Sequence, residues 1–392
     1  MARQVHHALI LNLHQPAQNL DALLAQEPWE AKQILWAIDR IPRSLWGWED
    51  VGRVHVSLSG TLLETLSRPD FQARVYGDVD VGGLLWHLQN ERLIRVLGTG
   101  YYHPVLPLIP AADREEHLGR WLALGRHLFW RQRFAGFWPP EMGFCMELVP
   151  LLARLGYRYA VVDSEHVEPV GALSWQELRY RPHRVRHGGS EITVVVRDRE
   201  LSAAQESGMD CAWFCREVAD RTRGCDFEPL VVTATDGDNG GWFRNPSDGA
   251  NFWGAFYGDL LARSRQDGAI RPTFIEDYLD RTPPADEIRV RTGAWNTGWH
   301  DGSDFLQWTG SHAQKDGLAA VAQVSAALHR LRADAAASGR DVWAAVDEAT
   351  WRLLRAETSC NFFWGEAWVE RCQGDLQEAR RWIAEARTRL GA

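Results

Sequence analysis

Short runs of apolar residues recur along the chain, and each is followed by polar residues, glycine or proline. Such runs are typical of β-strands that are buried on both faces. The pattern predicts strands at six places, residues 7–13, 54–58, 93–97, 134–138, 159–162 and 230–235.

Helical patterns lie between these runs. Residues 113–131 have an acidic first turn, and residues 147–155 are closed by Gly156. Strands that alternate with helices predict a parallel sheet. The alternation continues for about 290 residues, and no G-x-G-x-x-G segment follows the first strand, so the sequence favours a (β/α) barrel over an open dinucleotide-binding sheet.

Two regions depart from this alternation. Residues 174–199 alternate polar and apolar positions around Gly188 and Gly189, which predicts a β-hairpin inserted on the barrel. Beyond about residue 310 the strand signals stop, and residues 315–337, 341–355 and 375–390 read as helices. We therefore expect a barrel domain over residues 1–310 and a C-terminal helical region over residues 311–392.

Composition narrows the class of protein. The net charge of −9 and the scattered arginines argue against nucleic-acid binding, which needs clustered cations. Twenty tryptophans in 392 residues are an excess that favours a cleft where aromatic rings stack on sugars. The six cysteines include no C-x-x-C pair, so reduced thiols are expected rather than a zinc site.

The N-terminal segment bears on location. Its apolar stretch, residues 8–11, is too short for a signal peptide or a membrane span. We expect a cytoplasmic protein with no membrane partner. The sequence does not indicate an oligomeric state.

Uncommon polar residues follow the predicted strands at their carboxyl ends. Barrel enzymes build their active sites at that end of the strands. Each group alone could be an ordinary turn, but together they predict one site. The groups are His14 and Gln15 after the first strand, His103 after the third, Trp138 and Glu141 after the fourth, Asp163 after the fifth, and Asp236 and Asp238 after the last.

Glu141 and Asp236 stand out among these groups, because each follows an apolar strand in a bend shaped by proline or glycine. Cleavage of a glycosidic bond needs one ionised carboxylate at the anomeric carbon and one protonated carboxyl at the leaving oxygen. We expect these two carboxyl groups to lie about 5 to 5.5 Å apart, the separation that suits direct nucleophilic attack.

Four segments carry a resemblance to a known family. They are HQP (14–16), GYYHPVLPL (100–108), GFWPPEMGF (136–144) and VTATDGDNGGW (232–242). In order and approximate spacing they resemble the first four motifs of glycoside hydrolase family 57. The resemblance implies a retaining, α-glucan-active enzyme on an incomplete (β/α)7 barrel with a helical C-terminal region, and it implies no cofactor and no metal.

The resemblance also implies roles for individual residues. Glu141 would be the nucleophile and Asp236 the general acid/base, with Asp238 as the alternative acid because many members have Glu at its position. His14, His103 and Trp138 would line the subsite where the sugar is attacked. The remaining candidates for substrate binding are Gln15, Asp163, Trp242 and Trp364. Further stacking platforms are expected among Trp253, Trp295, Trp299 and Trp308.

The fifth motif departs from the family pattern S-D-W-x-W. The nearest match is Ser359-Cys360-Asn361-Phe362-Phe363-Trp364, which lacks the aspartate. We expect Cys360 and Asn361 to grip the sugar less strongly than the family residues, with Phe362, Phe363 and Trp364 as an apolar wall.

Hydrolysis and glucanosyl transfer to another sugar share their first half-reaction, so the sequence does not separate them. Two other readings stay open. One is a metal-dependent mannosidase or deacetylase, with His14, His103, Asp236 and His300 as imagined ligands. The other is an inactive glycan-binding protein that keeps the cleft. In each reading the expected partner is an oligosaccharide or polysaccharide.

Overall fold

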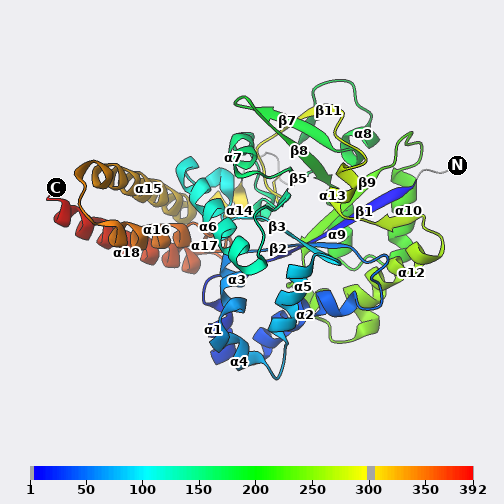
Figure 1. Ribbon diagram of the computed structural model, residues 1–392, viewed down its shortest axis with the longest axis horizontal. Coiled ribbons are helices and arrows are strands. Elements are labelled where there is room, and N and C mark those ends of the chain that lie inside the picture. The colour runs from blue at the N-terminus through cyan, green and yellow to red at the C-terminus, as the bar shows by residue number, and fades with distance from the viewer. Residues whose placement is uncertain (1–3, 298–304, 392) are drawn as a thin grey trace.

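The structure is a computed structural model that describes residues 4–297 and 305–391 (Figure 1). Eleven strands are described: β1 (Val5–Leu13), β2 (Val54–Leu58), β3 (Ile94–Leu97), β4 (Gly136–Phe137), β5 (Tyr159–Asp163), β6 (Val167–Pro169), β7 (His183–His187), β8 (Ser190–Arg197), β9 (Leu230–Asp236), β10 (Ile270–Pro272) and β11 (Asp286–Val290).

The helices of the first 310 residues are α1 (Asn19–Gln26), α2 (Pro28–Ser44), α3 (Gly60–Ser67), α4 (Pro69–Val75), α5 (Val81–Asn90), α6 (Ala111–Phe129), α7 (Leu148–Leu155), α8 (Trp175–Tyr180), α9 (Arg199–Glu206), α10 (Cys211–Arg221), α11 (Gly240–Arg244), α12 (Gly258–Gln266), α13 (Ile275–Leu279) and α14 (Leu306–Thr309). The helices that follow are α15 (His312–Ser338), α16 (Trp343–Ala356), α17 (Cys360–Phe363) and α18 (Glu366–Leu390).

The strands form an incomplete barrel. Parallel pairing runs from β3 through β2, β1, β9 and β8 to β5 and β4. The circuit is weakly joined at two places, because β8 and β9 share a single residue pair and β3 meets β4 only at a bridge between Gly98 and Phe137. Seven strands in this order fit the incomplete (β/α)7 barrel that the family resemblance implies.

The predicted strands are confirmed, with shifted ends. All six runs contain a strand, and β4 is the shortest because only Trp138 separates it from Pro139 and Pro140, which lack an amide hydrogen. The apolar runs are strands because both faces are covered; every residue of β1, β2 and β5 is buried.

The expected hairpin exists, but it is not an insertion. β7 and β8 pair antiparallel through a turn at Gly188 and Gly189, which both have positive φ. β8 is itself a barrel strand, paired with β5, and the start of the predicted range forms α8, which a capping box of Ser174 and Glu177 begins.

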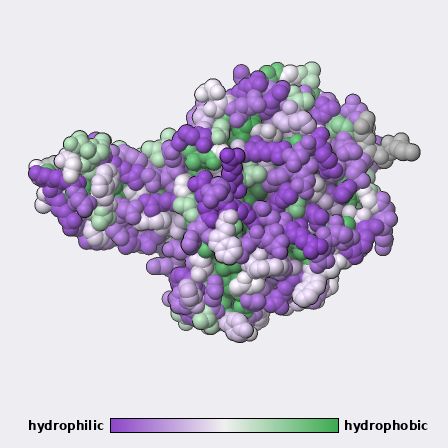
Figure 2. Space-filling view, viewed as in Figure 1, coloured by the Kyte–Doolittle hydropathy of each residue, from purple (hydrophilic) through white to green (hydrophobic). Residues whose placement is uncertain are grey.

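The helical region projects from the barrel on the side away from the N-terminus (Figure 1). Helices α15, α16 and α18 share a core that includes Leu328, Leu353 and Leu376. Val105 and Ala294 of the barrel join that core, so the two parts are packed together. The face seen in Figure 2 is mostly hydrophilic over both parts. Among the described residues, no helix is long and apolar enough to cross a membrane.

Candidate active site

A cavity of about 640 Å³ opens at the carboxyl ends of β1, β8 and β9. Residues of the barrel, of α1 and α2, and of the helical region line it together. Its polar lining includes Asn12, His14, Gln15, His103, Glu141, Arg197, Arg199, Glu206, Asp236, Asn239 and Arg244, and its aromatic lining is Trp295, Phe363, Trp364 and Trp368.

Glu141 reaches the cavity from a strained turn. It follows β4 in the short 3₁₀ helix η2 (Pro140–Met142), with φ 55° and ψ 20°, and Met142 also has a φ of 55°. A non-glycine residue in the left-handed region costs about 1 to 3 kcal/mol and persists only where its surroundings hold it. Here the Trp295 amide donates to the Glu141 carbonyl at 2.9 Å, which fixes the turn.

The Glu141 carboxyl group has a defined set of partners. The Ser359 hydroxyl donates to Oε1 at 2.7 Å, and His103 Nδ1 lies 3.5 Å from the same oxygen. The side chain is nearly buried, and burial raises the pKa of Glu141 to about 7 against the hydrogen bonds from Ser359 and Trp295. The carboxyl therefore changes charge close to neutral pH.

Asp236 is the last residue of β9. Asn12 Nδ2 donates to its Oδ1 at 2.8 Å, and Asn239 Nδ2 lies 3.4 Å from Oδ2. Burial raises the pKa of Asp236 to about 6, against the Asn12 bond and with the help of the charge on Glu141. The two carboxyl groups are thus close enough for the charge of Glu141 to affect the proton affinity of Asp236.

Asp238 lies behind this pair. Its side chain is 1% exposed, it is not part of the cavity lining, and Gln15 Nε2 donates to its Oδ2 at 2.8 Å. Burial, followed by the charge of Asp236, raises the pKa of Asp238 to about 7. Its position fits a support for Gln15 better than a proton donor to a bound sugar.

Two neutral imidazoles form one wall of the cavity. The rings of His14 and His103 stack with centroids 4.2 Å apart. Burial lowers the pKa of His103 to about 3 and lowers the pKa of His14 well below its usual range. The Cys360 thiol lies 3.5 Å from His14 Nε2. Because the imidazoles carry no charge, they suit hydrogen bonding to sugar hydroxyls.

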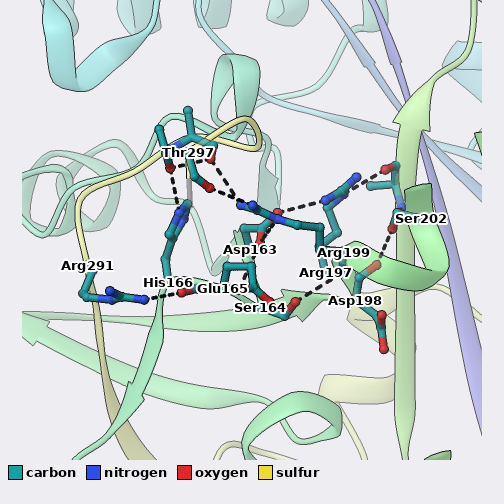
Figure 3. Close-up of polar contacts among 12 residues, drawn as sticks. Asp163, Ser164, Glu165, His166, Arg197, Asp198, Arg199, Ser202, Arg291 and Thr297 are labelled. Atoms are coloured by element: carbon teal, nitrogen blue, oxygen red, sulfur yellow. Dashed lines mark hydrogen bonds and ion pairs between the residues drawn. The ribbon is translucent and has the colours of Figure 1, made fainter. Parts of the chain in front are cut away.

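Asp163 acts on the cavity through two arginines (Figure 3). Arg197 donates to one oxygen of Asp163 and Arg199 to the other, each at 2.8 Å, and all three side chains are almost fully buried. Arg197 also donates to the Ala234 carbonyl at 2.9 Å, and Arg199 to the Thr297 carbonyl at 2.7 Å. The shared carboxylate holds both guanidinium groups rigidly against the cavity wall.

The structure brings six of the sequence-predicted site residues to the cavity, and they are Glu141, Asp236, His14, Gln15, His103 and Trp364. Trp138 is fully buried beneath it, edge-on to Trp295. Trp242 packs against Phe252 and Phe256 instead of facing the cavity. Among the expected stacking platforms, Trp295 lines the cavity and Trp253 and Trp308 are buried, whereas Trp299, like His300, lies outside the described residues.

The fifth-motif segment contributes differently from the expectation. Cys360, Phe363 and Trp364 line the cavity, but Phe362 is buried in the helical core. Asn361 is also buried, and its amide donates to the Ala356 carbonyl at 3.0 Å. This hydrogen bond joins the end of α16 to α17, so the Asn361 amide is not available to a sugar hydroxyl. Asn361 therefore does not take the place of the tryptophan in the family motif.

Sequence reasoning missed several side chains of the cavity, chiefly Asn12, Arg197, Arg199, Glu206, Ser359 and Trp368. Asn12 gave a signal, because it is a polar residue inside an otherwise apolar strand. Ser359 matches the serine of the fifth motif, but nothing in the sequence links it to Glu141, which is more than two hundred positions away.

The imagined metal ligands do not form a cluster among the described residues. Within residues 4–297 and 305–391 no group of three or more His, Cys, Asp or Glu side chains has the geometry of a metal site. His14 and His103 stack face to face, and Asn12 stands between His103 and Asp236.

Comparison with known proteins settles the family. The sequence profile described as glycosyl hydrolase family 57 matches residues 8–291, which is most of the chain. This chain belongs to family 57. It is 28% identical to an α-amylase of Pyrococcus horikoshii over 48% of this chain and 27% of that protein, and 32% identical to a 4-α-glucanotransferase of Thermococcus litoralis over 38% and 21%.

The fold agrees with that of a family 57 enzyme. The crystal structure of a GH57 branching enzyme from Thermococcus kodakaraensis matches with a TM-score of 0.75 at 14% identity, covering 97% of this chain and 90% of that one. In contrast, the chain matches only about a quarter of the length of the two curated relatives. This chain therefore shares the family and the fold of these proteins. Their enzymatic activities are properties of the relatives.

Proposed function

We propose that this family 57 protein is a retaining enzyme that cleaves α-glucan chains and passes the released sugar to water or to another sugar, with Glu141 as nucleophile and Asp236 as general acid/base. The observation that carries the proposal is that Glu141, just after β4, and Asp236, at the end of β9, line one cavity, and that the charge of Glu141 adds to burial in raising the pKa of Asp236.

The first half-reaction uses both carboxyl groups. A Glu141 oxygen attacks the anomeric carbon and forms an ester bond, while the glycosidic bond breaks and its oxygen takes the proton of Asp236. Oε1 of Glu141 is held by Ser359, which leaves Oε2 for the sugar. The step begins with Glu141 ionised and Asp236 protonated, and it ends with Asp236 ionised.

The second half-reaction reverses the roles. Asp236 takes a proton from water or from a sugar hydroxyl, the resulting oxygen attacks the anomeric carbon, and the bond to Glu141 breaks. The acceptor decides whether the outcome is hydrolysis or transfer. Every group in both steps is a side chain of this protein, so the mechanism requires no cofactor.

The proposal requires the first proton to reside on Asp236 although the pKa of Glu141 is the higher of the two in the empty cavity. The two pKa values are only about one unit apart, so a small change in the nearby charge decides which carboxyl group holds the proton. Positive charge developing at the anomeric carbon favours an ionised Glu141, and the Ser359 hydroxyl already stabilises that form.

The substrate class rests on two supports. The relatives are an α-amylase and a 4-α-glucanotransferase, both of which act on α-linked glucose polymers by name. The cavity offers aromatic surface from Trp295, Phe363, Trp364 and Trp368, on which the apolar faces of sugar rings stack.

The test is a comparison of wild type with Glu141→Gln and Asp236→Asn on maltooligosaccharides, amylose and aryl α-glucosides. We expect wild-type turnover with retained anomeric configuration, no turnover in Glu141→Gln with binding preserved, and azide rescue of Asp236→Asn on substrates with good leaving groups. Asp238→Asn is the matched control and should keep most activity.

Three results would contradict the proposal. Turnover by Glu141→Gln would remove its role as nucleophile, and azide rescue of Asp238→Asn instead of Asp236→Asn would move the acid/base to Asp238. Glycan binding by the wild type without turnover on any substrate would favour a glycan-binding protein.

A further inference from the structure

A chain of buried hydrogen-bonding side chains joins the two carboxyl groups along the wall of the cavity. Asn12 Nδ2 donates to Asp236 at 2.8 Å, and Asn12 Oδ1 lies 3.4 Å from His103 Nε2. His103 Nδ1 lies 3.4 Å from Ser359 Oγ and 3.5 Å from Glu141 Oε1, and Ser359 Oγ is 2.7 Å from Glu141 Oε1. Asn12, His103 and Ser359 are each at most 2% exposed.

The direction of each bond follows from what each group can donate. A carboxylate only accepts, so the Asn12 amide nitrogen faces Asp236 and its oxygen faces His103. His103 is neutral and must carry its hydrogen on Nε2 to meet that oxygen, which leaves Nδ1 as an acceptor. The tautomer is assigned from these partners.

The Ser359 hydroxyl then has one hydrogen and two acceptors. Oε1 of Glu141 is near, at 2.7 Å, and Nδ1 of His103 is farther, at 3.4 Å. A bond to an ionised carboxylate is about twice as strong as a bond between neutral groups. The Ser359 hydroxyl therefore donates to Glu141 whenever that carboxylate is charged. It donates to His103 Nδ1 only when Glu141 is neutral.

We propose that Ser359 is a positioning residue whose hydroxyl alternates between Glu141 and His103, so that Asn12, His103 and Ser359 link the states of the two carboxyl groups. The inference rests on the proposed function and adds to it a hydrogen bond that changes partner during the reaction. The helical region thus supplies, from the start of α17, a donor that acts on the nucleophile itself.

The alternation follows the charges of the reaction. When Glu141 forms the ester bond, its charge is lost, and Asp236 becomes ionised because its proton has left with the glycosidic oxygen. The Ser359 hydroxyl can then turn to His103 Nδ1, and the three donors Ser359, His103 and Asn12 all point towards Asp236. When the ester breaks, Glu141 regains its charge and the hydroxyl returns.

Other charged or titratable groups face this chain and are part of its environment. His14 stacks on His103, and Arg197 and Asp238 influence the proton affinity of Asp236 or respond to its charge. Cys360 lies beside His14, and Glu206 lines the same cavity and senses the charge of Asp236. Substitutions at Ser359 leave all five in place, which isolates the hydroxyl.

The first test measures Glu141 directly, without turnover. Carbon-13 NMR of glutamate-labelled protein, with the Glu141 signal assigned by its loss in Glu141→Gln, gives the pKa of this carboxyl. We expect Ser359→Ala to raise that pKa by about one unit, a tenfold change in proton affinity, and Ser359→Thr to leave it near the wild-type value. Ser57→Ala is the matched control, because Ser57 is a buried barrel serine whose hydroxyl has no hydrogen-bond partner among residues 4–297 and 305–391.

Two further readouts separate positioning from simple support of the fold. Nitrogen-15 NMR should find His103 with its hydrogen on Nε2. At pH 8, where Glu141 is ionised, kcat for aryl α-glucosides with good leaving groups should fall about tenfold or more in Ser359→Ala and fall further than kcat/KM. The reason is that the hydroxyl stabilises Glu141 as it leaves the ester.

Clear outcomes would overturn the inference. The inference is wrong if the pKa of Glu141 is the same in wild type and Ser359→Ala. It is also wrong if His103 carries its hydrogen on Nδ1. If the wild type turns over no glycan, the proposed function fails, yet both NMR measurements still decide whether the chain exists.

Discussion

At the scale of single residues, the site consists of carboxyl groups in positions where burial destabilises their ionised form. Glu141 is nearly buried in a strained turn and has one short hydrogen bond to its carboxyl group, and Asp236 and Asp238 are held beside it. Desolvation raises the pKa of all three. Function at this site therefore costs stability.

That cost predicts a pH-dependent gain in stability for Glu141→Gln. The pKa of Glu141 rises from its ordinary 4.5 to about 7 on folding, so the folded chain holds the proton more tightly and loses stability as pH rises between these values. At pH 8 Glu141→Gln should be more stable than wild type by roughly 3 kcal/mol, and at pH 4 the two should be equal.

Urea denaturation at the two pH values measures the difference. Glu348→Gln, at an exposed position of α16, should show no such dependence. A gain of equal size at pH 4 and pH 8 would contradict an origin in the ionisation of Glu141.

At the scale of elements, strand ends and the start of α17 position the site. The sequence predicted the strands and the residues after them, because buried runs and strand-end polar groups are local signals. It did not predict that Ser359 would reach Glu141 or that Asn361 would turn inward, because both depend on where α17 docks. Tryptophan excess was also a weak guide, since Trp46 and Trp130 are exposed and Trp121 is core.

The junction of β3 and β4 yields a prediction about barrel closure. At Gly98 an added Cβ would overlap the hydroxyl of Tyr157. The amide of the same residue joins the two strands, because it donates to the Gly136 carbonyl at 2.9 Å. Gly98→Ala should therefore separate β4 from β3, displace Glu141 and cost about 1 to 3 kcal/mol. Thermal unfolding together with turnover checks this.

A matched glycine separates the clash from the change of residue type. Gly119 lies in α6 with nothing near its Cβ position, so Gly119→Ala should be neutral or stabilise by up to about 1 kcal/mol. If Gly98→Ala keeps the stability and the turnover of the wild type, the junction of β3 and β4 accommodates the extra methyl group and the prediction is wrong.

The fifth-motif segment yields a second prediction at this scale. Cys360→Asp would restore the family residue and place a third carboxylate beside Glu141 and Asp236. Burial, and then the charges of Glu141 and Asp236, already raise the pKa of the Cys360 thiol. The pKa of each neighbouring carboxyl should rise, moving the lower limb of the pH–activity profile upward by about one unit. Cys360→Ser is the neutral control, and an unchanged profile in Cys360→Asp would place this side chain outside the electrostatics of the site.

At the scale of the whole molecule, a buried polar contact joins the barrel to the helical region. His117 of α6 donates Nε2–H to Glu357, just after α16, at 2.9 Å, and both side chains are fully buried. Burial, and then the charge of Asp113, raises the pKa of Glu357 well above its usual range. The sequence suggested the two regions from composition, but not this contact between them.

Removing the contact should uncouple the two regions. Glu357→Ala leaves the Nε2–H of His117 buried without its acceptor, at a cost of about 1 to 3 kcal/mol, and urea should then unfold the helical region before the barrel. Glu357→Gln keeps the shape and a neutral acceptor and should unfold in one transition like the wild type. A single transition in Glu357→Ala would show that apolar packing alone holds the regions together.

The position of Ser359 has a consequence for how the protein is made. A ribosome adds about 5 to 20 residues each second and domains fold as they emerge, so the strands that carry Glu141 and Asp236 are complete well before Ser359 exists. During that interval Glu141 lacks its hydrogen-bond donor Ser359 and the aromatic wall of Phe363 and Trp364. A nascent barrel therefore lacks part of the proposed active site, which is complete only when α17 has docked.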